Sequence, residues 1–111
     1  PAATSSRTIT IASKHPYKLW KIHGETLLPF VPKEMSGLTE PSATARQFYN
    51  IQAYAHVDVI AVRCDTLMQD KLLTGSRVRF HKIDKNDAVD IDTEHDFLLA
   101  ETLLKKRLGY V

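Results

Sequence analysis

Two acidic residues near the end of the chain, Asp90 and Asp92, have the types and spacing that could do chemistry. They follow the apolar pair Ala88 and Val89 and are separated by Ile91. On an extended strand end, residues two apart project to the same face, so the two carboxylates are expected roughly 6–7 Å apart. Neighbouring anions cost free energy unless a cation or water compensates them, and Mg²⁺ in proteins is held by one or two carboxylates. The pair is therefore a candidate magnesium site.

A second interpretation of the same residues is purely structural. Asp is a common helix N-cap, so Asp92 could cap the helix that follows, with Asp90 a solvated strand end. Spacing alone favours this interpretation, and the capping and metal-binding roles can coexist. Thr93 is the alternative cap. The helix is predicted from acidic residues in its first turn, basic residues in its last turn and the glycine after its end, namely Glu94, Asp96, Lys105, Lys106, Arg107 and Gly109.

The composition indicates one small globular domain. The chain has 111 residues, of which 43% are hydrophobic and 25% charged, and its net charge of +2 is too small and too mixed to indicate nucleic-acid binding. The single cysteine, Cys64, excludes an internal disulfide, fits a reducing compartment and is expected to be a packing residue. With no signal-peptide pattern and no apolar run of membrane-spanning length, a cytoplasmic location is expected. Because the chain begins with Pro1, we expect a processed chain or a piece of a longer one.

Short extended segments and few helices are expected along the chain. Residues 17–22 and 26–28 flank the turn at Gly24 and predict a hairpin, whereas residues 29–50 are proline-rich and predict a long loop. The apolar strand predicted at 55–63 is expected to be central in its sheet. The remaining elements are a strand at 7–12, a helix at 64–73, a strand at 77–83 and the final helix. This order indicates an α/β or α+β fold.

Four segments, in this order and spacing, resemble the acylneuraminate cytidylyltransferases, the enzymes that activate sialic acid-like sugars with CTP. The segments are His15-Pro16-Tyr17-Lys18, Leu28-Pro29, Arg46-Gln47, and Ala88-Val89-Asp90-Ile91-Asp92-Thr93-Glu94-His95-Asp96-Phe97. The resemblance spans nearly the whole chain but covers only the second half of a typical family member. It implies the C-terminal half of a three-layer, nucleotidyltransferase-like α/β fold with a protruding β-hairpin. In the family that hairpin is a dimerisation element, which corresponds here to residues 17–50, and residues 51–111 correspond to the C-terminal αβ core portion.

The resemblance implies a function and a partner. The chain is expected to be the C-terminal portion of a sugar cytidylyltransferase, which joins CTP and an acidic sugar into a CMP-sugar and pyrophosphate. The family's first half supplies most contacts to CTP, and no glycine-rich phosphate loop occurs in these residues, so activity of the chain alone is not expected. The alternative is a non-catalytic homodimeric binding or assembly module derived from the family. Under either interpretation we expect a homodimer, with Trp20 as an interface anchor.

The resemblance also assigns residues. Asp90 and Asp92 match the carboxylates that bind catalytic Mg²⁺, and Lys18 and Arg46 match cations that reach the acidic sugar across the dimer, with Gln47 in a supporting role. In the alternative interpretation neither cation binds a substrate: Lys18 is a solvated hairpin residue and Arg46 an ordinary loop cation.

The match is imperfect at the sugar pocket. The Asn-Gly-x-x-Tyr segment of the sialic acid enzymes is replaced by Tyr54-Ala55-His56-Val57-Asp58, which puts the identity of the sugar in question. The five histidines have no metal-ligand spacing, and His15, which precedes a proline, is expected to be structural.

Overall fold

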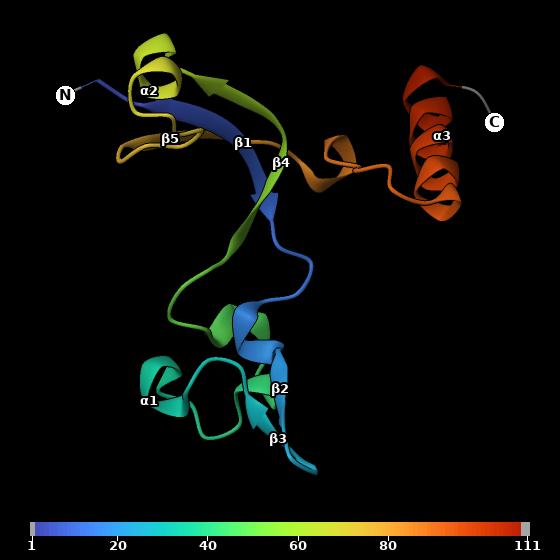
Figure 1. Ribbon diagram of the computed structural model, residues 1–111. Coiled ribbons are helices and arrows are strands. Elements are labelled where there is room, and N and C mark those ends of the chain that lie inside the picture. The colour runs from blue at the N-terminus through green and yellow to red at the C-terminus, as the bar shows by residue number, and fades with distance from the viewer. Residues whose placement is uncertain (1, 110–111) are drawn as a thin grey trace. The chain divides into compact units, whose positions relative to one another are not determined.

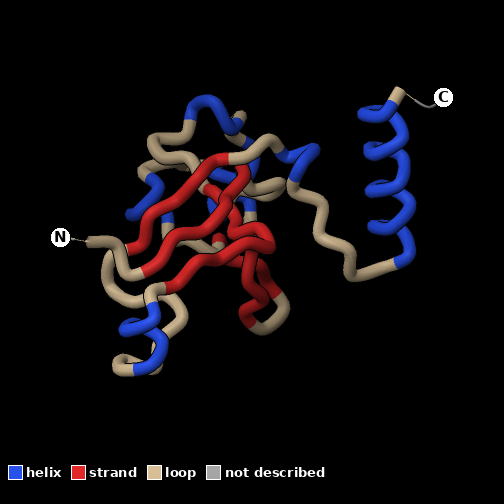
Figure 2. The backbone as a smooth tube through the Cα atoms, turned by 90° about the horizontal axis from the view of Figure 1, so that it is seen from above, coloured by secondary structure: helices blue, strands red, loops and turns tan. Residues whose placement is uncertain are grey.

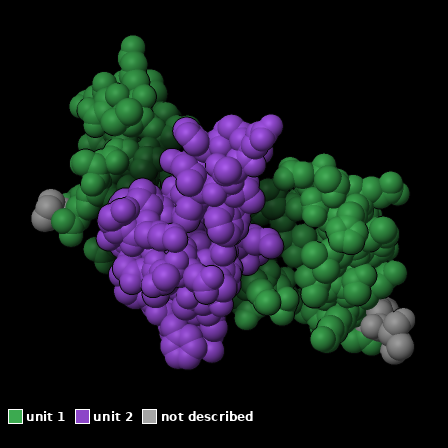
Figure 3. Space-filling view, turned by 90° about the horizontal axis from the view of Figure 1, so that it is seen from below, with its two compact units in different colours: residues 1–10, 55–111 green, residues 11–54 purple. Residues whose placement is uncertain are grey.

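The computed structural model describes residues 2–109 of this small mixed α/β protein, which divides into two compact units (Figures 1 and 3). Unit 1 takes residues 1–10 and 55–111, and unit 2 takes residues 11–54. Unit 2 contains the whole of the predicted 17–50 element. The carboxyl pair lies in unit 1, so each unit is described by itself below.

The sheet of unit 1 has three strands in the order β4-β1-β5, formed by β4 (Tyr54–Val62), β1 (Ser5–Ile11) and β5 (Val78–Lys82) (Figure 2). β1 and β5 are parallel, with a register that runs from Ser5 opposite Val78 to Ile9 opposite Lys82. β4 is antiparallel to β1, because the Thr8 hydroxyl donates to the Val57 carbonyl and the Arg63 N–H donates to the Thr4 carbonyl at 3.1 Å. The sheet is therefore mixed.

The central strand is not the one that the sequence predicts. The apolar strand expected at 55–63 is β4, which lies at the edge and buries only Val57, whereas the polar strand β1 occupies the centre. Hydropathy does not indicate this, because the hydroxyl groups of Thr4, Ser5 and Thr8, in and beside β1, donate to backbone carbonyls. Ser5 and Thr4 both donate to the Thr74 carbonyl, at 2.7 and 2.8 Å. Buried polar groups with such partners carry little penalty.

Unit 2 contains the predicted hairpin, which is confirmed as β2 (Trp20–His23) and β3 (Thr26–Pro29) in antiparallel register. Its first strand starts later than predicted, because Pro16–Lys18 forms a 3₁₀ turn, η1, whose N-terminus is capped by the His15 side chain. Proline at the first position suits such a turn. The predicted loop after the hairpin is also partly helical, with α1 (Lys33–Ser36), η2 (Pro41–Ala43) and η3 (Arg46–Phe48).

A cluster of three aromatic rings forms the core of unit 2. The His15 ring lies 4.6 Å from the Tyr17 ring and 4.4 Å from the Tyr49 ring, between centroids, and His15 is only 1% exposed. His15 Nδ1 accepts from the Tyr17 N–H at 3.1 Å, so its Nε2 carries the proton donated to the Ile51 carbonyl at 2.8 Å. The structural role expected for His15 is confirmed.

The helices of unit 1 are α2 (Cys64–Met68) and α3 (Glu94–Leu108), with the 3₁₀ turn η4 (Lys85–Asp87) before α3. The helix predicted at 64–73 is shorter than expected, since Lys71 has a left-handed φ of 56° that a helix cannot contain. The prediction of α3 is confirmed, including its basic last turn and its end at Gly109, which has a φ of 83°.

Few apolar side chains are buried in the described part of the chain. Only Tyr17, Tyr49 and Val57 count as buried hydrophobic residues there, and no described residue of α3 is buried. Exposed apolar surface of this extent marks sites of association in other proteins. None of the helices described at 2–109 is both long and apolar enough to cross a bilayer.

Gly75, three residues before β5, is expected to tolerate no side chain. Its φ is 74°, and a Cβ there would lie 2.5 Å from the Thr4 Oγ1 that bonds the Thr74 and Arg77 carbonyls. Gly75→Ala is expected to lower the free energy of unfolding by about 2–4 kcal/mol, through backbone strain plus overpacking. Chemical denaturation monitored by circular dichroism measures this.

Gly109→Ala is the matched control for this substitution. Gly109 has a similar φ of 83°, but a Cβ there would meet no atom within 4 Å, so only the backbone strain of about 1–2 kcal/mol is expected. Equal losses from the two substitutions would contradict the contact with Thr4.

Candidate functional site

The acidic pair lies in the exposed segment between η4 and α3, and its two carboxyl groups repel each other. The carboxylate of Asp92, followed by that of Asp58, raises the pKa of Asp90 above its ordinary value. A hydrogen bond from the protonated Asp90 carboxyl to Asp92 raises this pKa further. Like charges held together favour the protonated form, so the raised pKa reports their proximity. The arrangement is a paired anionic site that is open to solvent.

Asp58 is a third carboxylate that the sequence did not single out for this site. It stands in β4 with a φ of 33°, a left-handed value that is rare and strained for a side chain other than glycine. Its charge reaches Asp90 strongly enough to raise the pKa of that residue. Within residues 2–109, however, no group of three or more histidine, cysteine, aspartate or glutamate side chains is arranged to hold a metal ion. The candidate metal-binding set is therefore Asp90 and Asp92 alone.

The start of α3 fixes the backbone at one end of the pair. Thr93 is the N-cap, and its hydroxyl accepts from the Asp96 N–H at 3.1 Å. One oxygen of Asp96, Oδ2, in turn accepts from the N–H groups of both Asp92 and Thr93, each at 3.1 Å. Of the two caps that the sequence allowed, the structure uses Thr93. The side chain of Asp92 is thus not required to cap the helix.

These bonds also set the ionisation of Asp96. The N–H of Asp92 contributes most to lowering the pKa of Asp96 below its ordinary value, followed by the hydrogen bond with Thr93. A lowered pKa in the folded state means that this cap adds stability above the ordinary Asp range, and that the stability is lost as the pH falls through the pKa of Asp96.

A hard divalent cation fits the Asp90–Asp92 pair chemically. The donors are carboxylate oxygens, the ligand type that Mg²⁺ prefers, and their mutual repulsion is the cost that a cation removes. Mg²⁺ keeps several waters and needs only one or two carboxylates from the protein, so a pair in an exposed segment is sufficient.

The predicted substrate-binding residues belong to unit 2, whereas the acidic pair belongs to unit 1. Lys18 Nζ donates to the Thr44 carbonyl at 3.1 Å and lies 5.7 Å from the centroid of the Tyr49 ring. Arg46 Nη2 donates to the Ala12 carbonyl, and the Arg46 carbonyl accepts from Gln52 Nε2 at 3.1 Å. Gln47 lies in η3 and is exposed. Lys18 and Arg46 are therefore anchored to the backbone rather than freely solvated.

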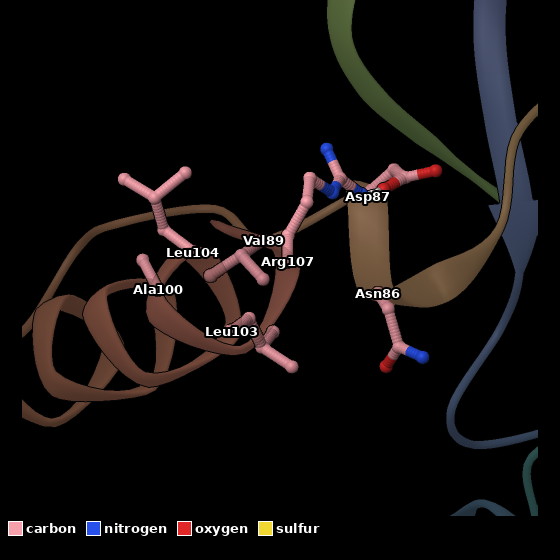
Figure 4. Close-up of a pocket in the computed structure, with 7 residues that line it drawn as sticks. All are labelled: Asn86, Asp87, Val89, Ala100, Leu103, Leu104 and Arg107. Atoms are coloured by element: carbon pink, nitrogen blue, oxygen red, sulfur yellow. Dashed lines mark ion pairs between the residues drawn. The ribbon is translucent and has the colours of Figure 1, made fainter. Parts of the chain in front are cut away.

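A small pocket lies between η4 and the last turns of α3 (Figure 4). Its volume is about 160 Å³, and the ion pair between Arg107 and Asp87 closes one side. Its lining includes Val89, next to Asp90, but neither carboxyl of the acidic pair. The lining residues are Asn86, Asp87, Val89, Ala100, Leu103, Leu104 and Arg107. The pocket is thus a packing feature that ties α3 to η4 rather than part of the acidic site.

A larger groove of about 430 Å³ lies within unit 2, along the hairpin. Its apolar floor comes from Trp20, Leu27, Leu28 and Pro29, and charged side chains of Lys33, Glu34 and Glu40 stand among the other lining residues. This size and mixture suit an apolar side chain or segment of a partner.

Sequence reasoning did not identify the roles of Asp96 and Asp58 beside the acidic pair, for different reasons. The sequence held a signal for Asp96, because a Thr followed three residues later by an acidic residue is close to the capping-box pattern, with Asp in the place of Glu. Asp58 lies 32 residues before Asp90 in the chain and meets it only through folding, so no local pattern could have shown its influence.

Comparisons with known proteins do not place the chain in a family. A scan against protein-family models finds no match, and a search of curated proteins finds no significant relative.

Asp90→Asn is expected to raise the melting temperature at pH 7 in metal-free buffer. The pKa of Asp90 is raised in the folded state, so its ionised form is destabilising above that pKa, and the destabilisation disappears as the pH falls through it. The gain from the substitution should therefore vanish at a pH below the ordinary Asp range. Differential scanning calorimetry at both pH values measures this.

Asp84→Ala serves as the control, because the Asp84 carboxylate caps η4 by accepting from the Asn86 N–H at 2.8 Å. Its removal should lower the melting temperature at pH 7. A lower melting temperature for Asp90→Asn as well would contradict the repulsion inferred for the acidic pair.

Proposed function

We propose that this chain is the C-terminal portion of a sugar cytidylyltransferase, which joins CTP and an acidic sugar into a CMP-sugar and pyrophosphate. The observation that carries the proposal is the electrostatic repulsion between the Asp90 and Asp92 carboxyl groups in the exposed segment before α3. These are the two residues that the resemblance assigns to catalytic Mg²⁺. The order of the four sequence segments that resemble the family supports the same function.

Asp90 and Asp92 would hold Mg²⁺ through their carboxylate oxygens. Bound there, Mg²⁺ would neutralise triphosphate charge and favour attack of the sugar hydroxyl on the α-phosphorus of CTP. The two carboxylates would leave most of the coordination positions to water and phosphate oxygens, which an exposed site allows. Their ionised forms are the ones that bind metal, so cation binding would lower the pKa of Asp90.

Lys18, Arg46 and Gln47 would recognise the acidic sugar. A guanidinium offers a planar fork of five N–H donors, of which the Nη2 group of Arg46 is engaged with the Ala12 carbonyl. Lys18 is engaged with the Thr44 carbonyl and would supply a compact positive charge. Because both cations are held by backbone carbonyls of unit 2, little side-chain entropy would be lost when they bind a carboxylate.

Most of the protein contacts that CTP needs would have to come from outside this chain. No glycine-rich phosphate-binding loop occurs in the sequence, and the acidic pair provides only metal ligands. The chain would therefore bind the metal and, weakly, the metal–nucleotide complex, without turnover of its own.

Calorimetric titration of Mg²⁺ with CTP into the purified chain tests this function. We expect weak, Mg²⁺-dependent CTP binding that the Asp90→Asn/Asp92→Asn double variant loses, because the bridging cation is lost with its ligands. The control variant, Glu25→Gln/Glu34→Gln, removes the same number of negative charges from unit 2 and should bind like the original chain. CTP binding that survives in the acidic-pair variant, or no binding at any Mg²⁺ concentration, would overturn the enzyme-derived site.

A non-catalytic homodimeric module is the second candidate, and the exposed hairpin favours it. Ile22 is 81% exposed, Leu27 56% and Phe30 59%, and Trp20 lines the groove of about 430 Å³ in the same unit. An exposed apolar knob and an apolar groove on one unit suit a two-fold contact, in which each copy offers both surfaces to the other. The homodimer is proposed under both candidate functions.

Light scattering across a range of concentrations tests the homodimer. The original chain is expected to be dimeric and the Trp20→Glu variant monomeric, because a charge in the apolar groove cannot be desolvated without a partner. Met68→Glu is the control, since Met68 is 73% exposed but lies on α2 in unit 1. A chain that is monomeric before mutation, or that dissociates equally in both variants, would exclude a hairpin interface.

A further inference from the structure

His15 is buried in the core of unit 2, where both nitrogen atoms of its ring are engaged. Its side chain is 1% exposed. Nδ1 accepts from the Tyr17 N–H at 3.1 Å, and Nε2 donates to the Ile51 carbonyl at 2.8 Å. A neutral imidazole has one acceptor and one donor and so satisfies both partners, whereas an imidazolium has two donors and no acceptor. Protonation of Nδ1 would therefore set its N–H against the N–H of Tyr17.

The elements packed against His15 present phenol rings and a cation. The Tyr17 ring belongs to η1, and the Tyr49 ring lies at the end of η3. The Tyr49 hydroxyl is already a donor, to the Pro41 carbonyl at 2.6 Å. Lys18, also in η1, places its ammonium group 5.7 Å from the centroid of the Tyr49 ring. A positive charge on His15 would be repelled by this ammonium group.

No carboxylate compensates such a charge in the part of the chain that the structure describes. The acidic side chains of unit 2 are all exposed, namely Glu25, Glu34 and Glu40. The ion pairs found among residues 2–109 join other side chains and do not include His15. An imidazolium in this core would be a buried charge without a partner, which is costly.

We propose that His15 makes unit 2 a pH-sensitive element, which is folded while the imidazole is neutral and opens when the imidazole is protonated. Protonation removes the acceptor that caps η1 and places an unpaired charge in the core. In an unfolded chain a histidine takes up its proton near pH ~6.5. Below that pH the unfolded unit binds one proton more than the folded unit, so acid favours the unfolded form. The inference is independent of the proposed function.

Opening of unit 2 would affect the surface that this unit carries. The hairpin of β2 and β3 and the groove beside it both belong to unit 2. Mild acid would therefore release whatever the hairpin binds. Histidine is the side chain whose charge changes most readily in this pH range.

Urea unfolding of the full chain at several pH values, followed by the fluorescence of Trp20, tests the proposal. Trp20 is the single tryptophan of the chain and lies in β2 of unit 2. If the folded unit excludes the proton, the unfolding equilibrium constant rises about 30-fold between pH ~7.5 and pH ~5. His15→Asn removes the titrating ring but keeps an oxygen that can cap η1, so its constant is expected to change less than about threefold.

His23→Gln is the matched control, because it removes an exposed histidine from the same unit. This variant should retain the full pH dependence of the original chain. An unfolding constant that does not change with pH in the original chain would overturn the proposal. Equal pH dependence in His15→Asn, or loss of the dependence in His23→Gln, would overturn it as well.

If His15→Asn does not fold, nuclear magnetic resonance of the original chain tests the same point. The ring signal of His15 is identified by its contacts with the rings of Tyr17 and Tyr49. During acidification this signal should keep its position and lose intensity, while an unfolded signal grows. A signal that moves continuously would show that the folded unit accepts the proton. That result, or a signal that keeps both its position and its intensity, would overturn the pH-sensitive role of His15.

Discussion

The repulsion between the Asp90 and Asp92 carboxylates is the constraint on which the candidate site depends. Two like charges in an exposed segment can separate cheaply unless the backbone beneath them is restrained. Here one restraint is visible, since the N–H of Asp92 is bound to a side chain in the first turn of α3. The chain thus uses the stability of a helix N-terminus to keep an unfavourable pair together. Such an opposition between local stability and charge is typical of binding sites.

The pKa values of two acids near the start of α3, Asp96 and Asp90, are shifted in opposite directions. Hydrogen bonds from backbone N–H groups lower the pKa of Asp96, whereas neighbouring carboxylates raise the pKa of Asp90. At neutral pH, Asp96 therefore stabilises the folded state as an anion, and Asp90 destabilises it as an anion. Between the pKa values of the two residues, acidification relieves the pair before it weakens the cap. The anchoring of the site is thus preserved in the pH range where its ionisation changes.

Sequence reasoning succeeded where the determining contacts are local. The hairpin follows from strand patterns on either side of Gly24, and α3 follows from charges at its two ends and a glycine after it. It failed where distant contacts decide. β4 is apolar, yet it lies at the sheet edge, because hydroxyl groups of β1 find carbonyl partners 49 and 69 residues away. The acidic pair was singled out from its residue types and spacing, but the influence of Asp58 required the fold.

Exposed apolar side chains occur in both units of this molecule. In unit 2 the apolar side chains gather on the hairpin and its groove, where a second copy could cover them. In unit 1 they occur on β5 and α3, where Phe80 is 61% exposed and Phe97 57% exposed. Parallel strands such as β1 and β5 are normally covered on both faces. The hairpin and its groove belong to unit 2, whereas β5 and α3 belong to unit 1, so the chain has two separate sets of exposed apolar side chains.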